Sequence, residues 1–115
     1  MAEILALQGW SVEDVSRQNI GYDIEGRRPD GTAVYVEVKS LDRPQQPFVL
    51  TPNEEGVARL KGSAYLLALV RQTQTHLEVG FIADPIKALP FVRQCRQWLW
   101  ECSEYEVTPE IYLLS

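Results

Sequence analysis

Two strand-like runs lie on either side of a turn: Tyr22-Asp23-Ile24-Glu25-Gly26-Arg27-Arg28, then Pro29-Asp30-Gly31, then Thr32-Ala33-Val34-Tyr35-Val36-Glu37-Val38-Lys39. Pro, Asp and Gly are the residues that favour a tight turn. The second run is rich in β-branched residues and is the strongest predicted strand of the chain. Because the connection is so short, we expect residues 22–28 and 32–39 to pair as an antiparallel hairpin.

The second run of this hairpin carries the residues with most chemistry. Side chains alternate along a strand, so Glu37 and Lys39 share one face while Val36 and Val38 share the other. An antiparallel neighbour that carries Asp23 brings a second carboxylate beside Glu37. Two carboxylates and a lysine suit a hard cation such as Mg²⁺, with Mn²⁺ as a substitute, and the lysine can position a water for attack on a phosphodiester. The alternative is a solvated edge-strand ion pair, which contributes little to stability.

The other periodic runs complete a mixed α/β pattern. A short helix is expected over residues 2–8, as part of a longer helix, and strands over 10–16, 48–50, 64–70 and 77–83. Thr51-Pro52-Asn53-Glu54 has the pattern of a capping box and predicts a helix from there to Lys61. The expected order is α-β-β-β-α-β-β-α-β, a mixed sheet with helices packed on it.

The C-terminal part is predicted to add a helix and an edge strand. Apolar residues at helical spacing predict one helical face: Phe91, Val92, Cys95, Trp98, Leu99 and Cys102. We expect this face to cover the side of the sheet away from Asp23 and Glu37, with the two cysteines as packing residues. Trp100 lies off the stripe and is expected on the surface, where a homodimer contact is one interpretation. Pro109 interrupts the run 105–114, which predicts a strand at a sheet edge.

Length, charge and cysteine content narrow the class of protein. The chain has 115 residues and a formal net charge of −5, which suits one domain with one modest core. No apolar run is long enough to span a bilayer, no secretory signal is recognisable, and two cysteines favour a reducing cytoplasm. The overall acidity argues mildly against a protein that coats nucleic acid. Residues 17–71 nevertheless carry a net charge of +1, so the acidity lies mostly outside the candidate site.

Asp23 followed by Glu37-Val38-Lys39 resembles the core of PD-(D/E)XK nucleases, in which an Asp on one strand and a D/E-x-K on the next form the active site. A longer set of residues is similar to the NO VEIN C-terminal domain family, which occurs in many bacterial proteins and is often joined to helicase or restriction-like regions. The similarity covers about residues 5–85, and its motifs are Gly21-Tyr22-Asp23-Ile24, Glu37-Val38-Lys39-Ser40, Phe48-Val49-Leu50-Thr51, Asn53-Glu54 and 58–65.

The resemblance implies roles for individual residues. Asp23, Glu37 and Lys39 would be catalytic, and Mg²⁺ would be bound by Asp23, Glu37 and the Val38 carbonyl. The candidates for substrate contact are Arg43, Gln45, Thr51, Asn53 and Lys61. For Thr51 and Glu54, a helix cap is the favoured interpretation. For Tyr22 two roles are open, stacking on a base and packing in the core.

The resemblance also implies a fold and a function. The expected fold is a restriction-endonuclease-like mixed sheet flanked by helices: an αβββαβ core over about residues 2–84 and a β-α-β extension over 85–115. It would form a single domain, residues 1–115, that is a module of a larger helicase- or restriction-type protein. The implied function is Mg²⁺-dependent cleavage of DNA in restriction or defence. The alternative is a catalytically silent copy of the fold that binds protein or DNA. Related nucleases often have a further Glu on the first helix, where this chain offers only Glu3.

Overall fold

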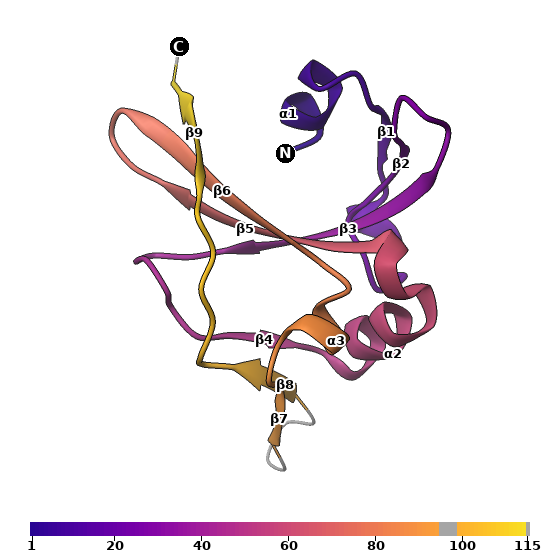
Figure 1. Cartoon of the computed structure of the whole chain (residues 1–115), viewed down its shortest axis with the longest axis vertical. Coiled ribbons are helices and arrows are strands. Elements are labelled where there is room, and N and C mark those ends of the chain that lie inside the picture. Colours follow the sequence, from indigo (N-terminus) through magenta and orange to yellow (C-terminus); the bar gives the residue numbers. More distant parts are fainter. Residues whose placement is uncertain (95–98, 115) are drawn as a thin grey trace.

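A curled six-stranded sheet divides the molecule into two layers (Figure 1). The computed structural model describes residues 1–94 and 99–114. The strand order in the large sheet is β1-β2-β3-β5-β6-β9. Its strands are β1 (Ser11–Asp14), β2 (Ile24–Arg27), β3 (Ala33–Ser40), β5 (Tyr65–Gln72), β6 (His76–Ala83) and β9 (Glu110–Leu113). A three-stranded sheet, β4-β8-β7, consists of β4 (Phe48–Leu50), β8 (Leu99–Cys102) and β7 (Val92–Gln94).

The pairing of β2 with β3 confirms the predicted hairpin. The two strands are antiparallel, with Ile24 opposite Val36 and Arg27 opposite Ala33. β3 then pairs in parallel with β5, and the connection between them carries β4 and the helix α2 (Pro52–Lys61). Parallel neighbours require such a crossover, because a tight turn can join only antiparallel strands. The observed architecture is therefore mixed α/β, as predicted.

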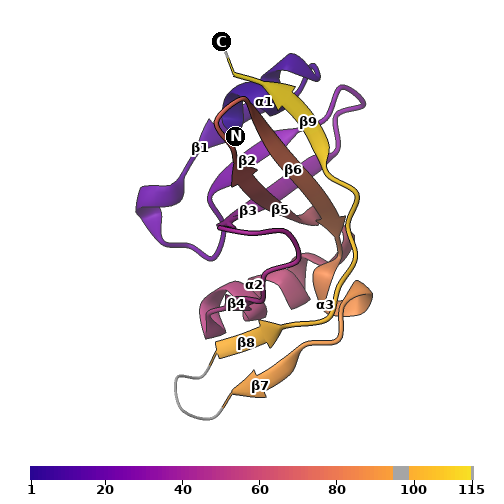
Figure 2. The same cartoon turned by 90° about the vertical axis from the view of Figure 1, so that its left-hand side faces the viewer.

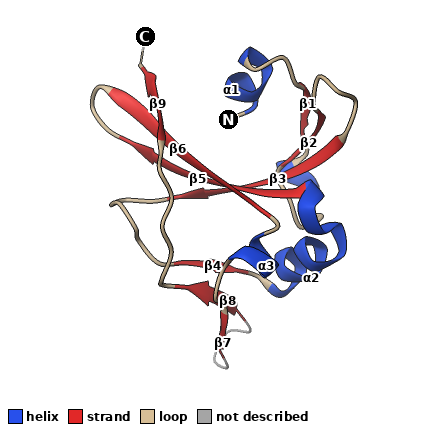
Figure 3. Cartoon of the chain, viewed as in Figure 1, coloured by secondary structure: helices blue, strands red, loops and turns tan. Residues whose placement is uncertain are grey.

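Each face of the large sheet has its own apolar core. The helix α1 (Ala2–Leu7) covers one face, where Ile4 and Leu5 pack against Val34 and Val36. On the other face lie α2, the short helix α3 (Pro85–Ala88) and the three-stranded sheet (Figure 3). That second core is formed by Phe48, Leu50, Ala58, Tyr65, Leu67, Leu69 and Cys102. Because residues alternate along β3, Tyr35 packs into the second core while Val34 and Val36 fill the first.

The predicted helix over residues 91–102 is wrong. The described residues on either side of 95–98 form β7 and β8, which pair antiparallel with Val92 opposite Glu101. β8 also pairs with β4, with Phe48 opposite Cys102. The short apolar strand β4 lies outside the large sheet, and its main-chain polar groups need partners from another segment. This long-range pairing overrides the helical spacing, so the extension contains a hairpin where a helix was expected.

The expected placement of that segment is wrong as well. Phe91 packs at 87° to Phe48, with ring centroids 5.9 Å apart, in the core on the α2 side of the sheet. Val92 covers no core, since 65% of its surface is exposed. Trp100 is partly buried against the second core, with the Arg93 guanidinium 6.0 Å from its ring, so it does not lie free on the surface. Cys95, Trp98 and the side chain of Leu99 lie outside the described residues, whereas Cys102 is fully buried, as a packing residue should be.

The C-terminal segment returns along the side of the molecule to the large sheet (Figure 2). After β8, residues 103–109 pass over β6, and β9 then pairs with the edge of the sheet, with Val79 opposite Glu110. The predicted edge position of the run 105–114 is confirmed, although only Glu110–Leu113 of that run form a strand. The crossing is close: a Cβ built on Gly80 would lie 2.5 Å from Val107 Cγ2. In the part of the chain that the structure describes, no helix is long and apolar enough to cross a membrane.

Candidate functional site

Asp23 is fixed where β2 and β3 separate. Its main-chain N–H donates to the Val36 carbonyl oxygen at 2.8 Å, as the last link between the two strands. Two residues further along β3, the Val38 N–H donates to Asp23 Oδ2, also at 2.8 Å. A main-chain donor without a partner in a partly buried place is costly. The Asp23 carboxylate supplies that partner, and this interaction holds it beside β3.

Glu37 and Lys39 extend from β3 on the α2 side of the sheet. They lie opposite Leu67 and Leu69 of β5, both of which belong to the second core. Glu37 is only 4% exposed, and a carboxylate at such a depth requires a compensating partner. Lys39 supplies one, with its Nζ 3.4 Å from Glu37 Oε2. The structure thus brings Asp23, Glu37 and Lys39 to one place.

Glu54 is a third carboxylate at this place, and its sequence pattern favoured a helix cap over a substrate contact. Its Oε1 lies 2.7 Å from Lys39 Nζ. The predicted capping box is present: Thr51 Oγ1 accepts from the Glu54 N–H at 3.1 Å, and Glu54 Oε1 accepts from the Thr51 N–H at 3.0 Å. The capping-box pattern therefore predicted the start of α2 correctly. It carries no information, however, about the distance between the first turn of α2 and Lys39.

The electrostatics of the site depend on an excess of carboxylates. Burial raises the pKa of Glu37 from 4.5 to about 8, and the negative charges of Glu54 and Asp23 act in the same direction. Lys39 opposes this shift without cancelling it. A hydrogen bond with Glu54 also favours the protonated form of Glu37. Near neutral pH the site therefore holds a proton on Glu37, and added positive charge would favour its release.

A buried tyrosine and a glycine hold the segment before Asp23 against α2. Tyr65 is fully buried, and its hydroxyl donates to the Gly21 carbonyl oxygen at 2.7 Å. Burial and the nearby carboxylates raise the pKa of this tyrosine, which keeps its hydroxyl protonated as a donor. Gly21 has φ +94°, and a Cβ at this position would lie 2.6 Å from Val57 Cγ2 of α2. In the sequence, Gly21 stands out only as part of a motif, and no pattern marks Tyr65 as part of the site.

The residues predicted to contact substrate lie in different elements of the fold and make different contacts. Thr51 caps α2, and Asn53 Nδ2 donates to the Asn19 carbonyl oxygen at 3.2 Å, which links α2 to the loop before Asp23. The Lys61 ammonium lies 4.4 Å from the centre of the Tyr35 ring. Tyr35 also packs edge-on against Tyr22, with ring centroids 5.0 Å apart, and both rings belong to the second core.

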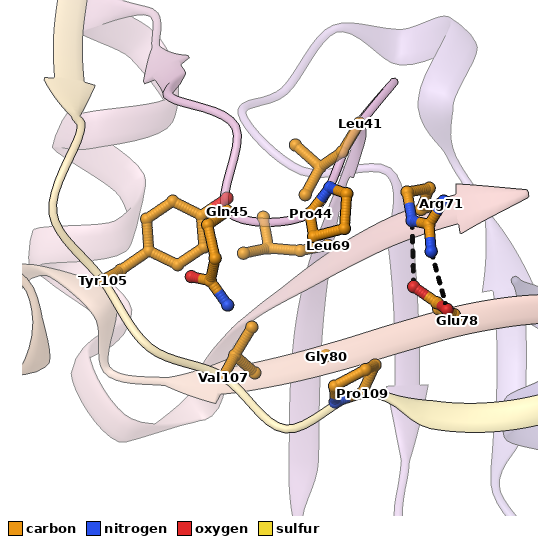
Figure 4. A pocket seen from close by; sticks show the side chains of 10 residues that line it. All are labelled: Leu41, Pro44, Gln45, Leu69, Arg71, Glu78, Gly80, Tyr105, Val107 and Pro109. Atoms are coloured by element: carbon orange, nitrogen blue, oxygen red, sulfur yellow. Dashed lines mark hydrogen bonds and ion pairs between the residues drawn. The ribbon is translucent and has the colours of Figure 1, made fainter.

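Arg43 and Gln45 lie in the exposed loop between β3 and β4. The Arg43 N–H points to the side-chain oxygen of Gln46 at 3.3 Å. Gln45 has φ +58° and lines a small cavity of about 70 Å³. Figure 4 shows this cavity between Gln45, Tyr105 and Val107, with the ion pair of Arg71 and Glu78 on one wall. Both residues therefore make their contacts away from the carboxylates of Asp23 and Glu37.

The donor atoms of the site match part of what Mg²⁺ requires. No group of three or more His, Cys, Asp or Glu side chains is arranged to hold a metal ion within residues 1–94 and 99–114. Mg²⁺ keeps several waters and needs only one or two carboxylates from the protein. Asp23 and Glu37 with the Val38 carbonyl provide such oxygen donors, so their chemistry fits. Glu3 adds nothing to this set, because it is exposed on α1, which packs on the opposite face of the sheet.

These observations define a mixed α/β domain with a buried carboxylate–lysine site between β2, β3 and α2. The chain belongs to the family described as Protein NO VEIN, C-terminal, whose model matches residues 1–82. The match includes Asp23, Glu37, Lys39 and Glu54 and ends before α3, the β7–β8 hairpin and β9. No curated protein and no solved structure matches the chain.

Proposed function

We propose that this chain is a nuclease module that hydrolyses phosphodiester bonds of DNA with Mg²⁺, or Mn²⁺ in its place. The observation that carries the proposal is the convergence of Asp23, Glu37 and Lys39, with Asp23 held by the Val38 N–H. The topology adds support. Antiparallel β1-β2-β3, followed by a crossover through α2 to a parallel β5, is the arrangement expected of a restriction-endonuclease-like core.

In this proposal Asp23, Glu37 and the Val38 carbonyl would hold the metal, which would supply charge stabilisation to the phosphoryl oxygens. The Lys39 ammonium donates hydrogen bonds to the attacking water and to the phosphate, and so orients the water for in-line attack. The hydrophobic side chains around Glu37 limit water access to its carboxylate, which strengthens its interaction with positive charge. The substrate-contact roles of Arg43, Gln45, Thr51, Asn53 and Lys61 remain part of the proposal.

The test separates metal binding from cleavage. Wild-type protein with Mg²⁺ or Mn²⁺ should cleave supercoiled plasmid DNA, and metal should raise the melting temperature, because a ligand that binds only the folded state stabilises it. Lys39→Ala should abolish cleavage and retain Mn²⁺ binding in calorimetry. Glu37→Ala should lose both, because it removes a ligand. A wild-type protein that shows neither cleavage nor a metal-dependent melting shift would contradict the nuclease proposal.

A second candidate function is a catalytically silent module that binds DNA or protein. The observation that favours it is the engagement of Lys39 by two carboxylates, together with the missing three-ligand group in the described residues. Its signature is binding to DNA, measured by fluorescence anisotropy, that is unaffected by Mg²⁺ and by Glu37→Ala. In either case we propose a cytoplasmic module of a larger helicase- or restriction-type protein, with a homodimer as a further hypothesis to be tested by light scattering.

A further inference from the structure

One oxygen atom of the Glu54 carboxylate takes part in two interactions, the cap of α2 and an ion pair with Lys39. Oε1 accepts the Thr51 N–H at 3.0 Å, which closes the capping box, and it also accepts Lys39 Nζ at 2.7 Å. A capping box needs only the first of these contacts. The contact with Lys39 joins α2 to β3 and contributes nothing to the cap itself, so it requires a separate explanation.

Lys39 has two carboxylates within reach and lies closer to Glu54. Its Nζ is at hydrogen-bond distance from Glu54 Oε1, whereas Glu37 Oε2 is 3.4 Å away. A lysine side chain has many rotamers, and holding its ammonium at one point requires a partner that is itself fixed. Only 19% of the Lys39 side chain and 17% of the Glu54 side chain are exposed, so solvent screens this pair less than a surface pair.

The Glu54 carboxylate is fixed because the first turn of α2 is tied to the segment before Asp23. Asn53 donates to the Asn19 carbonyl oxygen, and Gly21 lies directly against Val57. The same helical turn therefore has a set position relative to Asp23 and, through Glu54, relative to Lys39. The first turn of α2 therefore sets the positions of Asp23 and Lys39 relative to each other.

We propose that Glu54 is a positioning residue that holds the Lys39 ammonium in the site beside Glu37. The inference rests on the proposed nuclease function for its effect on catalysis. The interaction between Glu54 and Lys39 can, however, be tested without any cleavage. Glu54 touches neither a reacting atom nor the substrate in this scheme. It contacts the Lys39 ammonium directly, and its charge and hydrogen bond also raise the pKa of the neighbouring Glu37.

Glu54→Gln separates the role of this residue in the helix cap from its ion pair with Lys39. Glutamine also closes a capping box, so the start of α2 should be retained while the charge facing Lys39 is lost. Glu55→Gln is the matched control. It removes a charge from the next position of the same helix, where Glu55 pairs with Arg59 rather than with Lys39. A misplaced catalytic group costs about 100-fold in rate. We therefore expect kcat for plasmid cleavage to fall about 100-fold in Glu54→Gln and to stay at the wild-type value in Glu55→Gln.

Nuclear magnetic resonance of the lysine ammonium groups provides the readout that is independent of cleavage. The chain has three lysines, so Lys39→Arg identifies the Lys39 ¹⁵Nζ signal and Lys61 serves as an internal reference. In the wild-type protein we expect a through-hydrogen-bond coupling between Lys39 ¹⁵Nζ and the Glu54 side-chain carboxylate carbon. The coupling itself is measured on the wild-type protein, and Lys39→Arg serves only to assign the signal. In Glu54→Gln the Lys39 signal should broaden or shift, whereas Glu55→Gln should leave it unchanged.

The outcomes distinguish the two proposals. A coupling from Lys39 to Glu54, lost in Glu54→Gln, supports the positioning role even if the wild-type protein cleaves no DNA, in which case only the nuclease proposal fails. A Lys39 signal without coupling to Glu54, or coupled to Glu37 instead, overturns the positioning role. Cleavage that is unchanged in Glu54→Gln also overturns it, whatever the ammonium signal shows.

Discussion

Replacing Glu37 by glutamine should change how the stability of the metal-free protein depends on pH. In the folded protein the pKa of Glu37 is about 8, compared with 4.5 in the unfolded chain. Between these values the folded state binds one more proton than the unfolded state at this position, so the free energy of unfolding falls as pH rises. Glutamine cannot ionise, and its amide resembles the protonated acid in size and in its ability to donate to Glu54.

The size of this change in the free energy of unfolding follows from the shift in the pKa of Glu37. Each unit of pKa corresponds to about 1.4 kcal/mol, so a change from 4.5 to about 8 corresponds to roughly 5 kcal/mol. The stabilisation from protonated Glu37 is complete below the unfolded-state pKa and is lost as pH passes through the folded-state pKa. Relative to Glu37→Gln, the wild-type protein should therefore lose up to about 5 kcal/mol between about pH 4 and about pH 9.

Urea unfolding of both proteins in EDTA, at a series of pH values, measures this difference. Asp14, Asp30 and Glu78 have lowered pKa values because of hydrogen bonds to Ser16, Thr32 and His76, and they contribute to the pH dependence in the opposite direction. Both proteins contain these groups, so their contributions cancel when one curve is subtracted from the other. Parallel curves over the whole pH range would contradict this prediction, because they would mean that Glu37 has the same pKa in the folded and unfolded states.

Three further expectations concern the support of the site and its metal. Tyr65→Phe should lower the free energy of unfolding by roughly 1 kcal/mol, because the Gly21 carbonyl loses its buried donor; equal urea midpoints would show that this bond contributes nothing. Gly80→Ala should cost about 1–3 kcal/mol through overpacking against Val107, and adding Val107→Ala should recover most of the loss; strictly additive losses would place the strain elsewhere. Mn²⁺ affinity should rise with pH towards about 8, since Glu37 must release its proton to bind metal; calorimetry that finds no proton release in buffers of different ionisation enthalpy would contradict this.

Short-range patterns were sufficient for much of the fold. The Pro-Asp-Gly turn and the β-branched run predicted the hairpin that pairs Ile24 with Val36, and alternation placed Glu37 and Lys39 on one face. The capping box predicted the start of α2 at the residue where it begins. These features depend on neighbouring residues alone, since turn geometry, strand alternation and helix capping act within a few positions of the chain.

Local spacing predicted a helix over residues 91–102, whereas the described residues Val92–Gln94 and Leu99–Cys102 form strands. The deciding interaction there is the pairing of β8 with β4, about fifty positions earlier in the chain. Phe48 and Leu50 present an apolar strand whose main-chain groups need partners, and Cys102 and Trp100 pair with them. A helical spacing of a few apolar residues carries no information about such a distant partner, so tertiary pairing outweighs it.

Short-range sequence patterns are enough to place Asp23, Glu37 and Lys39 near one another, because a tight turn joins their strands. Only the tertiary structure brought Glu54 to the Lys39 ammonium and placed the Tyr65 hydroxyl against Gly21. Both contacts require the crossover from β3 through α2 to β5, which packs α2 on one face of the sheet. Turns and alternation are short-range effects, whereas the pKa of Glu37 and the position of Lys39 depend on burial and on charges from separate elements, which exist only once the chain has packed.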